Sequence, residues 1–342
     1  MKCKVTVSNG CFASPSVKGL VTDKMKILVT PTSFGPSAQL APKDKLLSFA
    51  DEIIYNPHSR PLTEDELIPL LEGCDGFLAG LDFITEKVIN ETSCLKVISR
   101  YGIGFDRVDI EAAKKKGIPV TNTPGANSDA VADLTLGLML SAARGIPMLD
   151  HSTKQGEWKR RTGIELGGKT LGLLGFGMIG KDVARRAAGF KMKIIAYDPY
   201  MDEQYAKENG ISSCSQEQVI KESDFVSLHL PLLDSTANII SKENIAKMRP
   251  GAIIINTARG GLIDEEALYE ALQSGHLGGA ALDAYENEPL DTSMPLYHLP
   301  NVVTTPHTGA HTTEASLNMA TMAVDNLINV LETGDCPYIV NR

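Results

Sequence analysis

Residues 169–199 read KTLGLLGFGMIGKDVARRAAGFKMKIIAYDP. An apolar run at Leu171–Leu174 leads into a glycine-rich turn, Gly175–Gly180. A helical stretch follows, and a second apolar run at Ile194–Tyr197 ends at Asp198. This order predicts strand, tight turn, helix and strand, the dinucleotide-binding unit of a doubly wound parallel sheet. Glycine-rich turns also occur with purely structural roles, but here the strand, the helix and the terminal acid are all present.

Each glycine of the turn has a physical role if a dinucleotide binds. Gly175 allows the sharp turn, Gly177 allows the backbone to approach a pyrophosphate, and Gly180 allows the helix to pack closely on the sheet. The pyrophosphate would lie on the free N–H groups at the positive end of the helix dipole. Asp198 is placed to accept hydrogen bonds from the ribose hydroxyls and to repel a 2′-phosphate, which favours NAD over NADP.

Composition narrows the class of protein. The 342 residues, 43% hydrophobic and 22% charged, suit two globular domains. A net charge of −9 argues against nucleic-acid or anionic-membrane partners. Six scattered cysteines without a CxxC pair favour a reducing compartment and argue against a disulfide framework or a zinc site. Without an apolar run of membrane-spanning length or a signal-peptide pattern at the N-terminus, we expect a cytoplasmic protein.

Apolar runs alternate with helical stretches along most of the chain, which predicts parallel sheets covered on both faces. Besides the two strands above, we expect strands at 27–30, 52–55, 76–79, 96–99, 118–121, 225–230, 252–256, 280–283 and 302–304. We expect helices at 109–116, 129–144, 217–222, 242–248, 265–273 and 312–331, and a capping box at Thr63–Glu66 opening a helix that Pro69 kinks or shortens. Six of these strands belong to the dinucleotide-binding sheet.

The fold class predicted is α/β with two doubly wound parallel-sheet domains. A flavodoxin-like substrate domain comprises residues 25–123 and 306–342, and a Rossmann domain comprises residues 124–305. The turn-rich segment 122–128 marks the crossing between them. Residues 1–24 form an extension to which we assign no role.

Three motifs follow predicted strands of the second domain, where ligands of open parallel sheets bind. Arg259, in NTARGG, can hold a carboxylate through its planar fork. The stretch ALDAYENEP offers Asp283, Glu286 and Glu288, and TPHTGAH offers His307. Taken singly, such arginines and acids are usually solvated loop residues. Together they support hydride transfer at a carbon that carries oxygen, with the histidine moving a proton and an acid holding the imidazolium.

Two further histidines bear on alternatives. His311 lies four residues after His307, a spacing found in metal sites, but Gly309 disfavours a continuous helix and no third ligand is evident. We therefore predict no metal. His229 ends a predicted strand, where it could line the cofactor pocket.

The motifs GFGMIG with Asp198, NTARGGLIDEEAL, ALDAYENEP and TPHTGAHTTEA together resemble the D-isomer-specific 2-hydroxyacid dehydrogenases, particularly the D-3-phosphoglycerate dehydrogenase branch. The resemblance runs from about residue 26 to about residue 329. It implies that Arg259 binds the substrate, that His307 donates and accepts the proton, and that Glu288, rather than Glu286, pairs with the histidine. A glutamate in that pairing argues against formate as substrate.

The resemblance also implies cofactor and substrate contacts. The cofactor-binding residues it implies are Gly175, Gly177, Met178, Ile179, Gly180, Asp198, Leu230, Thr257, Ala258, Asp283, His307 and Gly309. The substrate-binding residues are Tyr101, Gly102, Ile103 and Arg259, with the glycine turn donating backbone N–H groups to the substrate carboxylate. Two departures from phosphoglycerate enzymes stand out, because Tyr101 occupies a commonly small position and AGLD at 79–82 lacks the phosphate-binding arginine. We expect the nearby Asp82 to weaken phosphate binding.

The function predicted is an NAD-dependent D-2-hydroxyacid dehydrogenase (EC 1.1.1.-) that interconverts a D-2-hydroxy acid and its 2-keto acid, with or without a phosphate. The resemblance implies a homodimer joined through the cofactor domain, with Gly156–Trp158 reaching the partner. Two alternatives remain open. One is an NAD(H)-sensing interaction protein of the corepressor type, and the other is an NADP-linked glyoxylate or hydroxypyruvate reductase.

Overall fold

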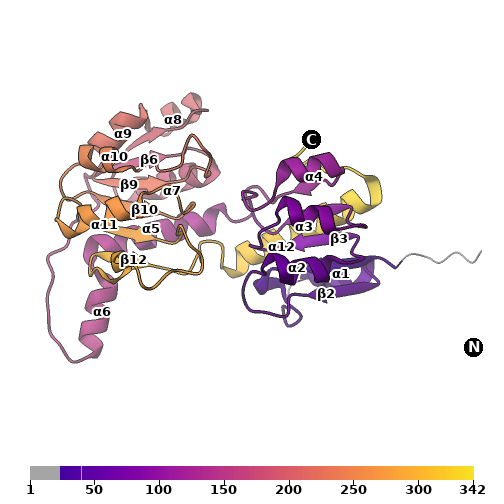
Figure 1. The fold of residues 1–342 in the computed structure, drawn as a ribbon. Helices are drawn as coiled ribbons and strands as arrows, with labels where there is room; N and C mark the ends of the chain where they lie inside the picture. The colour runs from indigo at the N-terminus through magenta and orange to yellow at the C-terminus, as the bar shows by residue number, and fades with distance from the viewer. Residues whose placement is uncertain (1–23, 40) are drawn as a thin grey trace, which may run out of the picture.

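The computed structural model describes residues 24–39 and 41–342, which form two lobes (Figure 1). Each lobe is built on one parallel sheet, so the α/β fold class with two doubly wound sheets is confirmed. The extension predicted at residues 1–24 lies outside the described residues except for Lys24. The domain boundaries at 123/124 and 305/306 remain predictions.

The first lobe has a five-stranded sheet in the order β2-β1-β3-β4-β5. Its strands are β1 (Lys26–Val29), β2 (Glu52–Tyr55), β3 (Gly76–Ala79), β4 (Val97–Arg100) and β5 (Val120–Thr121). Its helices are η1 (Thr32–Phe34), α1 (Ala41–Phe49), α2 (Glu64–Leu71), α3 (Glu86–Glu91), α4 (Ile110–Lys116) and α12 (Thr313–Thr333). The order reverses between β1 and β3, so the loops after these strands diverge and leave a crevice at their carboxyl ends.

Local signals explain where several of these helices begin and end. The capping box predicted at α2 is present, with the Thr63 N–H donating to Glu66 Oε2 at 2.9 Å, and Pro69 lies inside the helix two residues before its end. Helix α4 begins after Asp109, whose side chain accepts from the Ala112 N–H, and ends at Gly117 with φ +71°.

The second lobe has a seven-stranded sheet in the order β12-β11-β10-β9-β6-β7-β8. Its strands are β6 (Thr170–Leu174), β7 (Lys193–Tyr197), β8 (Ser212–Ser213), β9 (Phe225–Leu228), β10 (Ile253–Asn256), β11 (Gly279–Leu282) and β12 (Val302–Thr304). Its helices are α5 (Ser128–Arg144), α6 (Ile146–Lys154), α7 (Met178–Gly189), α8 (Glu203–Glu208), α9 (Gln216–Glu222), α10 (Lys242–Lys247), α11 (Glu265–Gln273) and η2 (Pro295–His298). Strands β7 and β8 are added on one side of β6, and strands β9 to β12 are added on its other side. The strand order therefore reverses between β6 and β9, as in dinucleotide-binding folds.

The expectation of six strands in this sheet was wrong by one. Strand β8 consists of two exposed serines, Ser212 and Ser213, that extend the sheet beyond β7. An edge strand with both faces in water carries no apolar run, and the hydrophobic pattern therefore gave no signal for it.

Two long helices tie the lobes together. Helix α12 returns to the first lobe and packs on β3, β4 and α1, where Ala320, Val324 and Leu327 are fully buried beside Ile27. Helix α5 is apolar on most sides because it packs against α7, β10 and β11 of the second lobe and also contacts α12. These contacts bring the strand ends of both sheets to a shared pocket.

Candidate active site

The glycine turn between β6 and α7 is closed tightly on one side and open on the other. Gly175 has φ +102°, and a Cβ on Gly180 would lie 2.4 Å from the Gly175 carbonyl oxygen. Packing inside the protein therefore requires both glycines. A Cβ on Gly177 would meet nothing within 4 Å among the described residues. The open space at Gly177, directly before the first turn of α7, fits a pyrophosphate approaching the free N–H groups of that turn.

Asp198 follows β7 and is bonded to the glycine turn. Its Oδ2 accepts from the Phe176 N–H at 2.7 Å, and its Oδ1 accepts from the Tyr200 N–H at 2.8 Å. The carboxylate thus holds the turn against the end of β7 while remaining partly exposed. A role toward the ribose hydroxyls remains a prediction.

His229 lies beneath the same turn. Its Nε2 is 2.9 Å from Ser227 Oγ, and its Cδ2 would be 3.9 Å from a Cβ built on Gly180. Burial lowers the pKa of His229 to about 3, so the ring is neutral at physiological pH. Next to it, Leu230 is buried, and so is Thr257, whose Oγ1 is 2.8 Å from Thr135 Oγ1. Their contacts with a cofactor, like those expected of Met178, Ile179 and Ala258, remain predictions.

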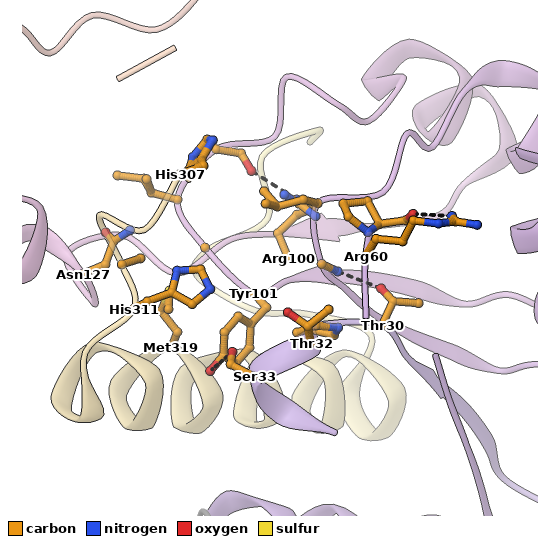
Figure 2. A pocket seen from close by; sticks show the side chains of 18 of the residues that line it. Thr30, Thr32, Ser33, Arg60, Arg100, Tyr101, Asn127, His307, His311 and Met319 are labelled. Atoms are coloured by element: carbon orange, nitrogen blue, oxygen red, sulfur yellow. Dashed lines mark hydrogen bonds between the residues drawn. The ribbon is translucent and has the colours of Figure 1, made fainter. Parts of the chain in front are cut away.

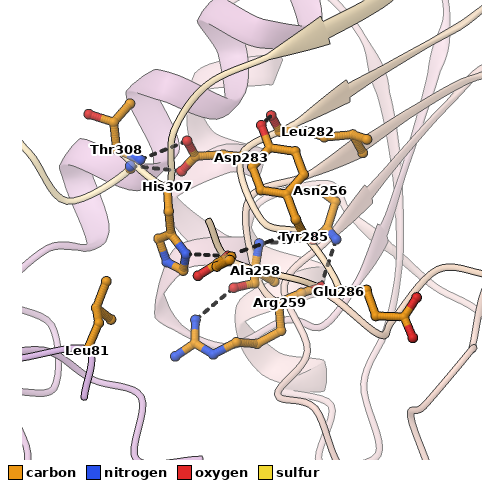
Figure 3. Close-up of polar contacts among 12 residues, drawn as sticks. Leu81, Asn256, Ala258, Arg259, Leu282, Asp283, Tyr285, Glu286, His307 and Thr308 are labelled. Carbon is orange, nitrogen blue, oxygen red and sulfur yellow. Dashed lines mark hydrogen bonds and ion pairs between the residues drawn. The ribbon is translucent and has the colours of Figure 1, made fainter. Parts of the chain in front are cut away.

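His307 and Glu288 form a close pair. His307 Nδ1 is 2.7 Å from Glu288 Oε1, whereas the exposed Glu286 points away from the histidine (Figure 3). Burial acts to raise the pKa of Glu288, but the hydrogen bond and charge of His307 and the charge of Arg107 outweigh it, and the pKa is lowered. Because Nδ1 faces the carboxylate, Nε2 is the nitrogen that can exchange a proton with a substrate.

The loop that carries His307 is anchored by Asp283. This buried carboxylate accepts from Thr305 Oγ1 at 2.6 Å and from the N–H groups of Thr308 and Gly309, both at 2.8 Å. His307 itself has φ +48°, a backbone conformation that residues other than glycine rarely adopt. Asp283 therefore stabilises a strained backbone, and the cofactor contacts expected of Asp283 and Gly309 remain predictions.

Arg259 follows β10 in a turn built by Asn256. The Asn256 side chain donates to the Arg259 carbonyl at 2.7 Å and accepts from the Ala258 N–H at 3.0 Å. Arg259 Nη1 donates to the Ala258 carbonyl at 2.7 Å, and its Nε donates to Asp106 Oδ1 of the first lobe at 2.9 Å. The guanidinium is thereby held at the boundary between the lobes (Figure 3).

One pocket between the lobes collects the residues expected to bind substrate. We call it the interlobe pocket; Tyr101, Gly102 and Ile103 line it from the first lobe, and Arg259 and His307 line it from the second. Figure 2 shows Tyr101 and His307 at this pocket. Every one of these residues follows the carboxyl end of a strand, as expected for open parallel sheets.

Other residues of the interlobe pocket were given no substrate-binding role from the sequence. They include Arg60, Arg100, Asn127 and His311, which are labelled in Figure 2, and of these His311 had been weighed only as a metal ligand. Arg60 lies in the loop after β2, so its position at a strand end was the available signal. Arg100 is buried and donates to the carbonyls of Gly104 and Ala79, and burial lowers its pKa to about 10.

Asp82 does not itself line the interlobe pocket, and the expectation that it weakens phosphate binding remains a prediction. Asp82 is fully buried, accepts from Thr30 Oγ1 and accepts from the Leu62 N–H at 2.8 Å. The neighbouring Leu81, and not Asp82, lines the interlobe pocket. Asp82 joins three loops of the first lobe, which is a structural role.

Metal-binding groups, membrane-spanning helices and disulfides were sought in residues 24–39 and 41–342. Within them, no group of three or more His, Cys, Asp or Glu residues is arranged to hold a metal ion. No helix in that part of the chain is long and apolar enough to cross a membrane. The cysteines found there, Cys74, Cys94, Cys214 and Cys336, are free. The cellular compartment remains a prediction.

Comparison with known proteins places the chain among two-lobed dinucleotide-binding proteins. Residues 136–309 match the family described as D-isomer specific 2-hydroxyacid dehydrogenase, NAD binding domain. The chain is 46% identical over 284 residues to the D-3-phosphoglycerate dehydrogenase of Methanocaldococcus jannaschii, a match that covers 82% of this chain and 54% of that protein. It is also 46% identical over 278 residues to the hydroxypyruvate reductase of Thermotoga maritima, covering 80% of this chain and 90% of that protein.

Solved structures agree with this placement. The TT0316 protein of Thermus thermophilus superposes with a TM-score of 0.83 at 39% identity, covering 92% of this chain and all of that one. D-Lactate dehydrogenase of Aquifex aeolicus, complexed with NAD and lactic acid, superposes with a TM-score of 0.80 at 29% identity, covering 92% and 99%. The chain belongs to the D-isomer specific 2-hydroxyacid dehydrogenase family, whose cofactor domain binds NAD.

Proposed function

We propose that this protein interconverts a D-2-hydroxy acid and its 2-keto acid with NAD as cofactor. The observation that carries the proposal is the His307–Glu288 pair, 2.7 Å apart, at a pocket that also holds Arg259 and the glycine turn at Gly102. A dehydrogenase of this kind needs a proton donor and acceptor, a cation for the carboxylate and a bound nicotinamide, and we assign these roles to His307, to Arg259 and to a cofactor on the glycine turn between β6 and α7.

The bound cofactor supplies or accepts a hydride at its nicotinamide ring. The chain's own residues do the rest. Arg259 holds the substrate carboxylate through its planar guanidinium, assisted by the N–H groups of the 101–104 turn. His307 Nε2 delivers a proton to the keto oxygen during reduction and removes it during oxidation. Glu288 stabilises the imidazolium and fixes the ring through Nδ1.

A turnover assay tests this function. The purified protein is mixed with NADH and a panel of 2-keto acids, including glyoxylate, hydroxypyruvate, pyruvate and phosphohydroxypyruvate. We expect oxidation of NADH with at least one of them, with the D-hydroxy acid as product wherever the product is chiral. If no member of the panel supports turnover although NADH binds, the NAD(H)-sensing function of the corepressor type is favoured instead.

The same assay with NADPH tests the role of Asp198. The carboxylate lies at the end of β7 beside the glycine turn, where its charge disfavours a 2′-phosphate. We expect kcat/KM to be clearly higher with NADH. Comparable values for the two cofactors would contradict the role given to Asp198 and favour an NADP-linked reductase.

A second substrate class is favoured by one feature of the pocket. The charged side chains among its described lining residues, leaving the histidines aside, are the arginines Arg60, Arg100 and Arg259. Arg60 forms an exposed two-point ion pair with Glu66, at 2.7 and 2.8 Å, which a substrate phosphate can replace. D-3-Phosphoglycerate is therefore a candidate substrate together with the unphosphorylated acids. The rates of turnover with hydroxypyruvate and with phosphohydroxypyruvate distinguish the two substrate classes.

A homodimer is the assembly we propose. Helix α6 and the segment after it project from the second lobe (Figure 1). They expose Ile146 and Trp158, which are 49% and 83% accessible. Large exposed apolar side chains on a projecting arm are typical of an interface between copies.

A further inference from the structure

Arg107 connects the first lobe to the acid–base pair of the second. It lies in the loop between β4 and α4, and its Nη2 is 2.6 Å from Glu288 Oε2. The other oxygen of the same carboxylate is 2.7 Å from His307 Nδ1. The side chains of Arg107 and Glu288 are only 15% and 14% exposed. One largely buried carboxylate thus joins an arginine from one lobe to the histidine of the other.

Arg107 is held in place by the first lobe itself. Its Nη1 donates to the Leu81 carbonyl at 2.9 Å, and its guanidinium lies over the Phe83 ring, 4.7 Å from the ring centroid. Its own carbonyl accepts from the Ile84 N–H at 2.8 Å. These contacts fix the guanidinium independently of Glu288, so its position moves with the first lobe.

The preceding residue, Asp106, also forms an ion pair across the lobes, but here the first lobe supplies the acid and the second lobe supplies the arginine. Asp106 Oδ1 accepts from Arg259 Nε at 2.9 Å. Burial acts to raise the pKa of Asp106, but the charge and hydrogen bond of Arg259 outweigh it and lower the pKa. Two consecutive residues of the first lobe are therefore paired with the two charged groups that the proposed reaction requires in the second lobe.

We propose that Arg107 is a positioning residue, one that aligns His307 through Glu288 only when the lobes are closed. The proposal rests on the proposed function. In a closed molecule Arg107 holds Oε2, so the carboxylate presents Oε1 to the histidine in a single orientation. In an open molecule Arg107 moves away with its lobe, and Glu288 loses the partner that fixes its rotation. The acid–base pair is thereby completed by the same movement that encloses the substrate.

Kinetics of Arg107→Met, Arg107→Gln and Arg107→Lys test the proposal. Misalignment of an acid–base group lowers kcat, and we expect a loss of about 10- to 100-fold for the Met and Gln variants. The Kd for NADH should stay within about twofold, because Arg107 belongs to the first lobe and the glycine turn at Gly175–Gly180 belongs to the second. Arg107→Lys keeps the charge, so it should recover a large part of the loss. Arg249→Met, which removes an arginine from the ion pair with Asp224, is the matched control.

A readout independent of turnover separates this proposal from the proposed function. In ¹⁵N spectra of the protein labelled at histidine, the signals of His307 are identified by their absence from the His307→Asn variant. We expect the Nδ1 signal to shift in Arg107→Met and Arg107→Gln but not in Arg249→Met. If none of the 2-keto acids supports oxidation of NADH by the wild type, the proposed function fails. The spectra still test the contact of Arg107 with Glu288 in that case. Unchanged His307 signals, a kcat within about twofold of wild type, or an equal loss in all three Arg107 variants would overturn the proposal.

Discussion

Asp283 is the residue on which the position of His307 depends. Its three hydrogen bonds, at 2.6 to 2.8 Å, come from Thr305, Thr308 and Gly309, on either side of the strained histidine. The sequence pattern placed Asp283 at a strand end, and the family resemblance implied a cofactor contact. It could not reveal that the carboxylate is occupied by its own chain, because that depends on the path of a loop more than twenty residues further along.

Replacement of Asp283 by Asn should reduce activity and stability together. An amide offers one acceptor oxygen where the carboxylate uses two, so at least one buried N–H group loses its partner, at a cost of about 1–3 kcal/mol. We expect a lower kcat and a melting temperature lower by several degrees, roughly 4 °C or more. Asp291→Asn, at an exposed carboxylate that accepts from the Ser293 N–H, is the control. Wild-type kcat and melting temperature in Asp283→Asn would show that the anchor is dispensable.

His229 should make the stability of the protein depend on pH. Its pKa is about 3 in the folded protein, because of burial, and about 6.5 when the chain is unfolded. Below pH 6.5 the unfolded state therefore binds a proton that the folded state does not, and stability falls as the pH falls from 6.5 toward 3.

Urea unfolding of the wild type and His229→Gln at pH 7 and pH 5.5 checks this effect. We expect the free energy of unfolding of the wild type to fall by about 1 kcal/mol more than that of the variant over this interval. The comparison cancels the contributions of the other titrating groups. The same pH dependence in both proteins would contradict a neutral His229 in the folded state.

The resemblance was needed to choose between two acids. From the residue pattern alone, Glu286 and Glu288 were equivalent acids of the loop after β11. Arg60 and Arg107 were not singled out at all. A lone arginine in a loop usually extends into water, and only the folded structure reveals that Arg107 reaches Glu288 across the boundary between lobes.

The turn between β6 and α7 contains two kinds of glycine. Two of its glycines are required by packing within the protein, and one has open space that a ligand can occupy. Gly175 and Gly180 are confined by their own chain, but Gly177 has an ordinary φ of −73° and open space around its Cα among the described residues. The described residues alone therefore give no reason for glycine at position 177. The approach of a pyrophosphate gives one.

Gly177→Ala should fold normally and bind NADH poorly. The added methyl group occupies the space in which the pyrophosphate meets the backbone, and we expect the Kd for NADH to rise about tenfold or more, which corresponds to about 1.4 kcal/mol. Thermal unfolding without cofactor should be unchanged. Gly189→Ala, at the other end of α7 and also without neighbours within 4 Å in the described structure, should leave both quantities unaffected. Wild-type affinity in Gly177→Ala would argue against this placement of the pyrophosphate.

Strands with an apolar run were predictable, and a strand without one was not. The apolar runs at β2, β3 and β12 coincide with the strands of the structure, because each of them carries apolar side chains at the right spacing. Strand β8, two exposed serines, was missed. The packing of β8 beside β7 is a tertiary contact that no local pattern encodes.

The whole molecule is proposed to act as a dimer through its projecting arm. Trp158 and Ile146 expose apolar surface that would be covered by a second copy. We expect light scattering coupled to size exclusion to give twice the monomer mass for the wild type and a larger monomer fraction for Trp158→Glu combined with Ile146→Glu. Tyr200→Glu, at a side chain that is 93% exposed on the same lobe but outside the arm, is the control. A monomeric wild type would contradict the proposed assembly.

Joining the two lobes gives the molecule its chemistry. The interlobe pocket takes Tyr101 and Gly102 from one sheet and Arg259 and His307 from the other, although these residues are spread over some two hundred positions of the chain. The strand-end rule for parallel sheets anticipated Arg259 and His307 from the sequence, and the family resemblance anticipated Tyr101 and Gly102. The ion pairs Arg107–Glu288 and Arg259–Asp106 depend on how the lobes meet, so the strand-end rule could not predict them.

The decisive measurement is the rate of a single turnover by His307→Asn. NADH is bound first, a 2-keto acid accepted by the wild type is added, and the loss of NADH fluorescence is followed. Removal of the proton donor should slow this step by about 10²- to 10⁴-fold while the Kd for NADH stays near that of the wild type. His298→Asn, at an exposed histidine bonded to the Thr292 carbonyl, should react at the wild-type rate. A His307→Asn variant that turns over as fast as the wild type would contradict the assignment of His307 as the proton donor.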